Sequence, residues 1–204
     1  MNKILTIFAA IFLLAAGCNT AVPVVQPVGP AKSIVPDVLI PTPTTQLYEN
    51  ATYNFQFSYP LSMVFVTPNY ANLENKIVQL QISQNAYPKT NFGDAGFAVS
   101  ETYAKSLTDC LAATNAPANS DDFKTKVSIN GQDFYMTNSN EAGAGNLYQS
   151  KVYRAYVAQG SCIELDETIH TAQLANFTPG TVTAVDTSAV QQRLDSVLQS
   201  FRFN

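Results

Sequence analysis

The strongest constraint on the fold is a strict alternation of aromatic and polar side chains in the segment Tyr53–Pro60, whose sequence is YNFQFSYP. Successive side chains of a β-strand point to opposite faces of its sheet, so this alternation predicts a strand with one buried, aromatic face. Pro60 lacks an N–H group and ends the run. The residues that share the aromatic face are Tyr53, Phe55, Phe57 and Tyr59.

Further strands are predicted wherever alternation or β-branched residues recur. The dipeptide Asn130-Gly131 predicts a tight hairpin between two of them, because both residues tolerate a positive φ. The predicted segments are 63–66, 76–83, 96–103, 124–129, 133–138, 147–158 and 162–169.

Two helices are also predicted, the first over about residues 104–113. The second begins near Ser188, which forms an S-x-x-Q capping box with Gln191, and leads into a short terminal strand, Phe201–Phe203. Many antiparallel strands with few helices favour an α+β fold with a central antiparallel sheet flanked by helices. The apolar residues at helical spacing are Val190, Leu194, Val197, Leu198 and Phe201.

The predicted single α+β domain spans residues 47–204 and follows a segment of different composition. Residues 18–46 contain six prolines and few charges, which predicts a disordered, extended linker. An alternative is that the last third of this segment docks on the domain as an edge strand. The apolar residues that would dock are Val35, Val38, Leu39 and Ile40.

The N-terminal segment, residues 1–17, has the layout of a secretory signal peptide. Lys3 supplies a positive charge, and the apolar run 4–14 is too short to span a bilayer. The ending Leu14-Ala-Ala-Gly-Cys18 resembles the lipobox of bacterial lipoproteins, which implies cleavage before Cys18 and its acylation with fatty acids such as palmitate. The alternative is a secreted protein in which Cys18 is a free thiol.

The lipobox resemblance implies an extracytoplasmic lipid anchor in the cell membrane or the outer membrane. In Gram-negative lipoproteins an Asp after the cysteine resembles an inner-membrane retention signal, and here that position is Asn19. An outer-membrane anchor is therefore favoured in a Gram-negative envelope. A Gram-positive cell would hold the protein on the outer face of its membrane.

Residues 47–204 resemble the PsbP-like domains. The resemblance rests on Tyr48, on the YNFQFSYP strand and on a final helix that runs into VLQSFRF. It implies a central antiparallel sheet flanked by helices. It also implies a binding or assembly module more readily than an enzyme, although a fold alone does not fix a function.

Cys110 and Cys162 are the other two cysteines, and in an exported chain they predict a disulfide. Closing a loop of about 50 residues stabilises a fold by roughly 4 kcal/mol in the chain-entropy model. Two buried free thiols are the alternative. A catalytic pair of a cysteine with His170, the only histidine, is a further alternative.

His170 follows three acidic residues, a set that could hold a cation. Alternation places Glu164 and Asp166 on one face and Glu167 on the other, so we expect a solvated strand end and no metal site. No cofactor is predicted either. The sequence contains no P-loop, no G-x-S-x-G motif and no H-E-x-x-H motif.

The glycine-rich segment EAGAGN, residues 141–146, lacks the residues of a phosphate-binding loop. We expect a hairpin or longer loop there, and such loops often carry binding. The candidate binding-loop residues are Asn138, Asn140, Gly143, Gly145 and Asn146.

The net charge of the chain limits the classes of partner that it can bind. A net charge of −4 and a pI near 4.8 without a basic cluster disfavour nucleic-acid binding. The predicted partners are the membrane, through acylated Cys18, and an envelope protein. The sequence thus predicts a lipid-anchored, non-enzymatic binding or assembly module; the alternatives are a structural tethered protein or a hydrolase of unfamiliar motif.

Overall fold

The computed structural model describes residues 44–66, 75–112, 123–157 and 160–204. The predicted signal peptide, Cys18 and most of the expected linker lie outside these ranges. In the part of the chain that is described, no helix is long and apolar enough to cross a bilayer.

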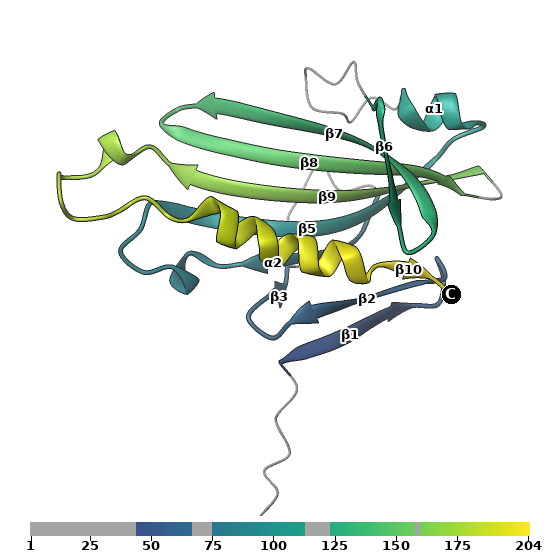
Figure 1. Cartoon of the computed structure of the whole chain (residues 1–204), viewed down its shortest axis with the longest axis horizontal. Helices are drawn as coiled ribbons and strands as arrows, with labels where there is room; N and C mark the ends of the chain where they lie inside the picture. The colour runs from purple at the N-terminus through teal and green to yellow at the C-terminus, as the bar shows by residue number, and fades with distance from the viewer. Residues whose placement is uncertain (1–43, 67–74, 113–122, 158–159) are drawn as a thin grey trace, which may run out of the picture. The chain divides into compact units, whose positions relative to one another are not determined.

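Two antiparallel sheets form the described part of the domain (Figure 1). The smaller sheet has the order β1-β2-β10, where β1 is Thr45–Asn50, β2 is Phe55–Pro60 and β10 is Arg202–Phe203. The larger has the order β3-β4-β5-β9-β8-β7-β6. Its strands are Val64–Phe65 (β3), Lys76–Ile82 (β4), Phe92–Tyr103 (β5), Thr125–Ile129 (β6), Gln132–Gly143 (β7), Asn146–Val157 (β8) and Ser161–Ala172 (β9).

The described residues form two α-helices, α1 (Leu107–Leu111) and α2 (Thr187–Ser200), and 3-10 turns at Gln84–Ala86 and Leu174–Asn176. Helix α2 packs on one face of the larger sheet and also contacts β2 (Figure 1). We call the sheet face under α2 the inner face and the opposite one the outer face. The α+β class is therefore confirmed, although the sheets carry few helices.

The predicted aromatic face of β2 is buried in the core between the two sheets and α2, except at Tyr53, which precedes the strand and is 39% exposed. Phe55 and Phe57 are fully buried, and the ring of Phe201 lies 5.3 Å from that of Phe55. Removing a large aromatic side chain from such a core costs about 3–5 kcal/mol. Helix α2 adds four of the five apolar residues that the sequence assigned to its buried stripe, Val190, Leu194, Val197 and Leu198; the fifth, Phe201, follows the helix and is also buried.

Two helix starts differ from the sequence prediction. The expected capping box at Ser188 is wrong, because Asp186 caps α2 and its carboxylate accepts hydrogen bonds from the N–H groups of Ser188 and Ala189. The first helix is shorter than residues 104–113, since Ser106 caps it and accepts from Asp109 N–H. Both caps satisfy N–H groups that have no partner within the first helical turn.

The expected solvated strand end at Glu164, Asp166, Glu167 and His170 is also wrong. Alternation assigned the faces correctly, but Glu167 points to the inner face and is 1% exposed. The carboxyl of Asp166 is mostly desolvated on the outer face, and this burial, with Glu164 beside it, raises its pKa to about 6. Glu167, which the sequence predicted to be solvated, therefore belongs to the core.

Candidate functional site

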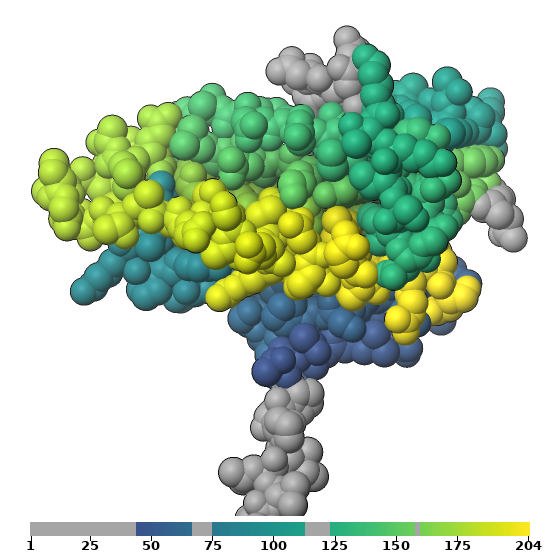
Figure 2. All heavy atoms as spheres, in the orientation of Figure 1, coloured from purple at the N-terminus to yellow at the C-terminus, as the bar shows by residue number. Residues whose placement is uncertain are grey.

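A groove of about 410 Å³ lies between the N-terminal half of α2 and the β7–β8 hairpin. Figure 2 shows α2 in yellow beside the green surface of this hairpin. The lining of the groove contains no apolar residue. It consists of Asn138, Ser139, Asn140, Gln149, Ser150, Lys151, Thr187, Ser188, Gln191, Gln192 and Asp195.

The groove exists because the inner face changes character along the hairpin. Near α1 the inner-face positions of β7 and β8 hold apolar residues, such as Phe134 and Tyr153, which are buried. Toward the hairpin tip the same positions hold Asn138, Asn140 and Lys151, and α2 faces them with polar side chains. Neither surface offers the apolar area that would close the gap by packing.

Hydrogen bonds and an ion pair hold the floor of the groove in place. Gln191 Nε2 donates to Glu167 Oε2 at 2.8 Å and to Asp195 Oδ1 at 2.9 Å. Lys151 Nζ lies 3.2 Å from the same Asp195 oxygen, and Tyr153 Oη donates to Glu167 Oε2 at 3.4 Å. These contacts fix α2 against β8 and β9 and leave the outer ends of the polar side chains open to a ligand.

Burial raises the pKa of Glu167 to about 8, and the nearby Asp195 carboxylate adds to the effect. The Oε1 atom of Glu167 is buried and has no hydrogen-bond partner in the part of the chain that the structure describes. At neutral pH the Glu167 carboxyl is therefore mostly protonated. Burial and the proximity of Glu167 also raise the pKa of Tyr153.

The structure separates the five candidate binding-loop residues into two groups. Asn138 and Asn140 line the groove from β7. Gly143 and Asn146 close the hairpin around Ala144 and Gly145, both at positive φ. The segment is thus a two-residue hairpin turn, one of the forms expected for it.

The hairpin tip is fastened to the rest of the domain. Asn176 Nδ2 donates to Gly145 O at 2.7 Å, and a Cβ on Gly145 would lie 2.6 Å from that nitrogen. Asn146 Oδ1 lies 3.0 Å from His170 Nε2, and His170 Nδ1 lies 3.3 Å from Asp94 Oδ2. His170 is on the outer face, away from the groove.

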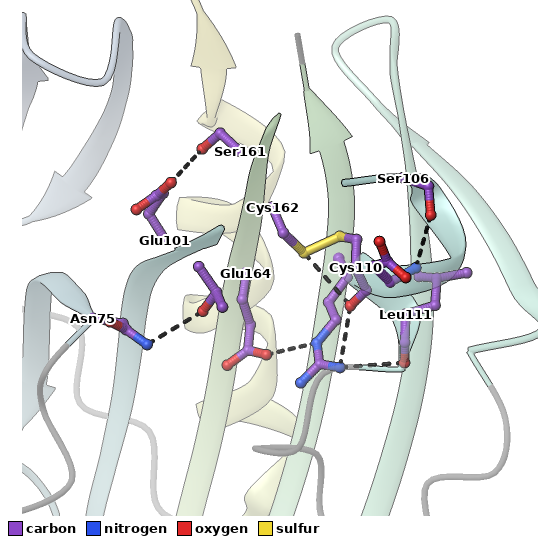
Figure 3. The surroundings of a disulfide bond; sticks show 11 residues. Asn75, Glu101, Ser106, Cys110, Leu111, Ser161, Cys162 and Glu164 are labelled. Atoms are coloured by element: carbon purple, nitrogen blue, oxygen red, sulfur yellow. Dashed lines mark hydrogen bonds and ion pairs between the residues drawn. A yellow bond between two sulfur atoms is a disulfide. The ribbon is translucent and has the colours of Figure 1, made fainter. Parts of the chain in front are cut away.

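Cys110 and Cys162 form the predicted disulfide, with Cα atoms 5.3 Å apart (Figure 3). It joins α1 to the outer face of β9. Arg154, 1% exposed, lies beside it, donates to Glu164 at 2.7 Å and reaches the carbonyl groups of Cys110 and Leu111. Because both sulfurs are bonded, the alternative of a cysteine paired with His170 is excluded.

Sequence reasoning missed the polar floor of the groove. A signal for one member was present, since Glu167 interrupts the apolar inner-face series Ile163, Leu165 and Ile169. The contribution of Gln191 and Asp195 depends on where α2 docks. Among the described residues, no group of three histidine, cysteine or acidic side chains is placed to hold a metal ion.

No protein-family model matches the chain, and no curated protein sequence matches it. Among solved structures, a protein from Bacteroides thetaiotaomicron is similar with a TM-score of 0.47 and 10% identity. That match covers 79% of this chain, which spans about half (49%) of the Bacteroides protein.

Two smaller proteins are similar over most of their length. The cyanobacterial PsbP protein, CyanoP, from Synechocystis has a TM-score of 0.48 and 15% identity, over 88% of this chain and 100% of that one. LpqN of Mycobacterium tuberculosis, which is involved in cell envelope biogenesis, has a TM-score of 0.45 and 10% identity, over 78% of this chain and 90% of that one.

Proposed function

We propose that this protein is a lipid-anchored, extracytoplasmic binding module of the bacterial cell envelope, and that the groove between α2 and the β7–β8 hairpin takes its ligand. The observation that carries the proposal is the polar groove on a hydrogen-bonded floor. Polar side chains that hydrogen bonds hold in place lose little freedom on binding, so more of their interaction energy contributes to affinity for the ligand. The lipobox-like ending at Cys18 supports the location.

The residues around the groove favour binding over catalysis. Lys151 is ion-paired with Asp195, so it is a poor base for the neighbouring hydroxyl groups. His170, the only histidine, lies on the outer face. Amide and hydroxyl side chains predominate in the lining, and each can both donate and accept hydrogen bonds.

Photocrosslinking in living cells tests the binding role. A benzophenone amino acid placed at Gln192, which lines the groove, should give an adduct with a larger molecule. The matched control is Gln199, an exposed glutamine at the other end of the same helix and outside the groove. Equal adducts from both positions, or none from Gln192, would contradict the proposal.

The anchor is tested separately. The Cys18→Ser variant should lose labelling by an alkyne analogue of palmitate and leave the membrane fraction, because acyl chains on that cysteine are the proposed attachment. If the variant stays in the membrane fraction after a carbonate wash, the anchor is not Cys18.

A further inference from the structure

Among the described residues, one edge of strand β7 is paired along only part of its length. The turn Ala144-Gly145 makes Gly143 and Asn146 a hydrogen-bonded pair, as two-residue hairpins do. Main-chain bonds from β7 to β8 then recur at every second residue. The residues of β7 that alternate with the bonded ones, Asn138, Asn140 and Ala142, point their main-chain N–H and C=O groups away from β8.

Strand β6 covers the first part of this edge and then stops. It pairs with Gln132–Met136 and begins at Thr125, opposite Met136. No hydrogen bond among the described residues satisfies the outward main-chain groups of Asn138, Asn140 and Ala142. Three consecutive outward positions therefore offer donors and acceptors spaced for another strand.

Apart from the charge of Glu141, the edge lacks the features that normally prevent strand pairing. Protected edges are very short, or carry proline, lysine or a bulge. Residues 137–143 have the sequence TNSNEAG, and their pairing with β8 shows no register shift. At the other end of the sheet the edge strand β3 has only two residues.

The groove lies directly beside this edge, since Asn138 and Asn140 belong to both. Alternate side chains of an added strand would therefore enter the groove and meet the amide and hydroxyl groups of Asn140, Ser188 and Gln192. Small polar side chains suit that lining. The other side chains would lie on the outer face, next to the exposed carboxylate of Glu141.

Two exposed carboxylates lie beside the edge, and Lys124 lies where β6 stops. The ion pair of Lys151 with Asp195 is internally balanced, whereas Glu141 and Asp186, both exposed, have no cationic partner among the described residues. The whole chain has a net charge of −4, so a second copy would bring like charge to the edge. A basic partner is favoured instead.

From these features we infer that the free edge of β7 binds an extended, basic segment of another polypeptide by strand addition, with small polar side chains entering the groove. The inference rests on the proposed binding role of the groove and names its ligand class. Main-chain hydrogen bonds supply affinity in such complexes, and the side-chain pockets supply selectivity.

A proline substitution tests the main-chain pairing without changing the pairing to β8. Asn140→Pro removes an N–H that points away from β8 and places the ring where the added strand would lie. Asn140→Ala loses the same groove side chain but keeps the N–H, so the difference between the two variants isolates the main-chain contribution. Ala142→Pro makes the same change at the next outward position, should Asn140→Pro fail to fold by circular dichroism.

The probe is a fluorescein-labelled decapeptide of alternating threonine and lysine, titrated by anisotropy against the full chain in detergent. We expect Asn140→Pro to bind at least about tenfold more weakly than Asn140→Ala, and Ala142→Pro at least about tenfold more weakly than the wild type. The same peptide with every second amide N-methylated, or with glutamate for lysine, should also bind at least about tenfold more weakly.

Each other outcome overturns the inference. Strand addition is rejected if a folded Asn140→Pro binds as tightly as Asn140→Ala, or a folded Ala142→Pro as tightly as the wild type. Equal binding of the glutamate peptide rejects the basic partner. Absence of binding by every peptide rejects the ligand class. A dimer of the wild type that Asn140→Pro dissociates makes a second copy the occupant. The groove itself is tested by the Gln192 crosslink: an adduct that persists in Asn140→Pro leaves the proposed function standing while strand addition fails.

Discussion

Replacing Glu167 with glutamine should change how the stability of the domain depends on pH. The carboxyl has an ordinary pKa of 4.5, and burial raises it to about 8 in the folded protein. Below pH 4.5 the carboxyl is protonated in both states. As the pH rises toward 8, the unfolded chain loses this proton while the folded chain keeps it, so the free energy of unfolding falls.

The size of this loss in stability follows from the pH interval between the two pKa values of Glu167, 4.5 in the unfolded chain and about 8 in the folded protein. Each pH unit within it lowers the free energy of unfolding by about 1.4 kcal/mol. Asp166 contributes in the same direction, but only below about pH 6, where its own raised pKa lies. Between pH 6 and 8 the loss therefore belongs to Glu167, and it amounts to about 2 kcal/mol.

Glu167→Gln should remove this dependence. Glutamine does not titrate, and its carbonyl oxygen can accept the hydrogen bonds that Gln191 and Tyr153 now donate to Glu167. Its amide group would occupy the place of Oε1, which has no partner, and that costs about 1–3 kcal/mol at every pH. The slope with pH, and not the absolute stability, is the diagnostic quantity.

Urea unfolding at pH 5, 6, 7 and 8 measures the slope. Far-ultraviolet circular dichroism is the signal, because the chain has no tryptophan. Glu141→Gln, at an exposed position, is the matched control and should keep the wild-type profile. If Glu167→Gln loses as much stability between pH 6 and 8 as the wild type, Glu167 is not the titrating group and the reasoning fails.

Three further changes probe the fold. Replacing both cysteines of the Cys110–Cys162 disulfide with alanine should lower stability by about 4 kcal/mol, measured by urea unfolding, because the bond closes a long loop of the chain. Arg154→Met should cost about 3–5 kcal/mol by the same assay, since it leaves Glu164 without its ion pair; a change below about 1 kcal/mol would contradict this. Asn130→Ala should lower the melting temperature more than Asn130→Gly, because glycine tolerates the positive φ of this turn position.

The elements that depend on local pattern were predictable from the sequence. The aromatic face of β2, the Asn130-Gly131 turn and the buried stripe of α2 each follow from residues close together in the chain. The start of α2 was not predictable from the sequence, because Asp186 and Ser188 are both good capping residues and lie two positions apart. The side chain that reaches free N–H groups is settled by how the preceding segment enters the helix.

In the site, too, the residues of a local sequence pattern were predictable, whereas those brought in by tertiary packing were not. Asn138 and Asn140 were singled out as polar residues of a glycine-rich hairpin, and they line the groove. The other wall comes from α2, which lies much later in the chain, and nothing in the local pattern of Gln191 or Asp195 tells which strand they face. Glu167 was misjudged because charged residues near other acids are usually solvated.

Strand β10 has a consequence for the order in which the chain acquires structure. It pairs with β2, and the N–H of Asn204 donates to Asn54 O while the Asn54 side chain donates to the carbonyl of Asn204. The sheet that opens the domain is thus completed by the last residues of the chain. Pairing over such separations is slow. We therefore expect the smaller sheet to be completed late in folding, after the larger sheet and α2 have formed the rest of the core.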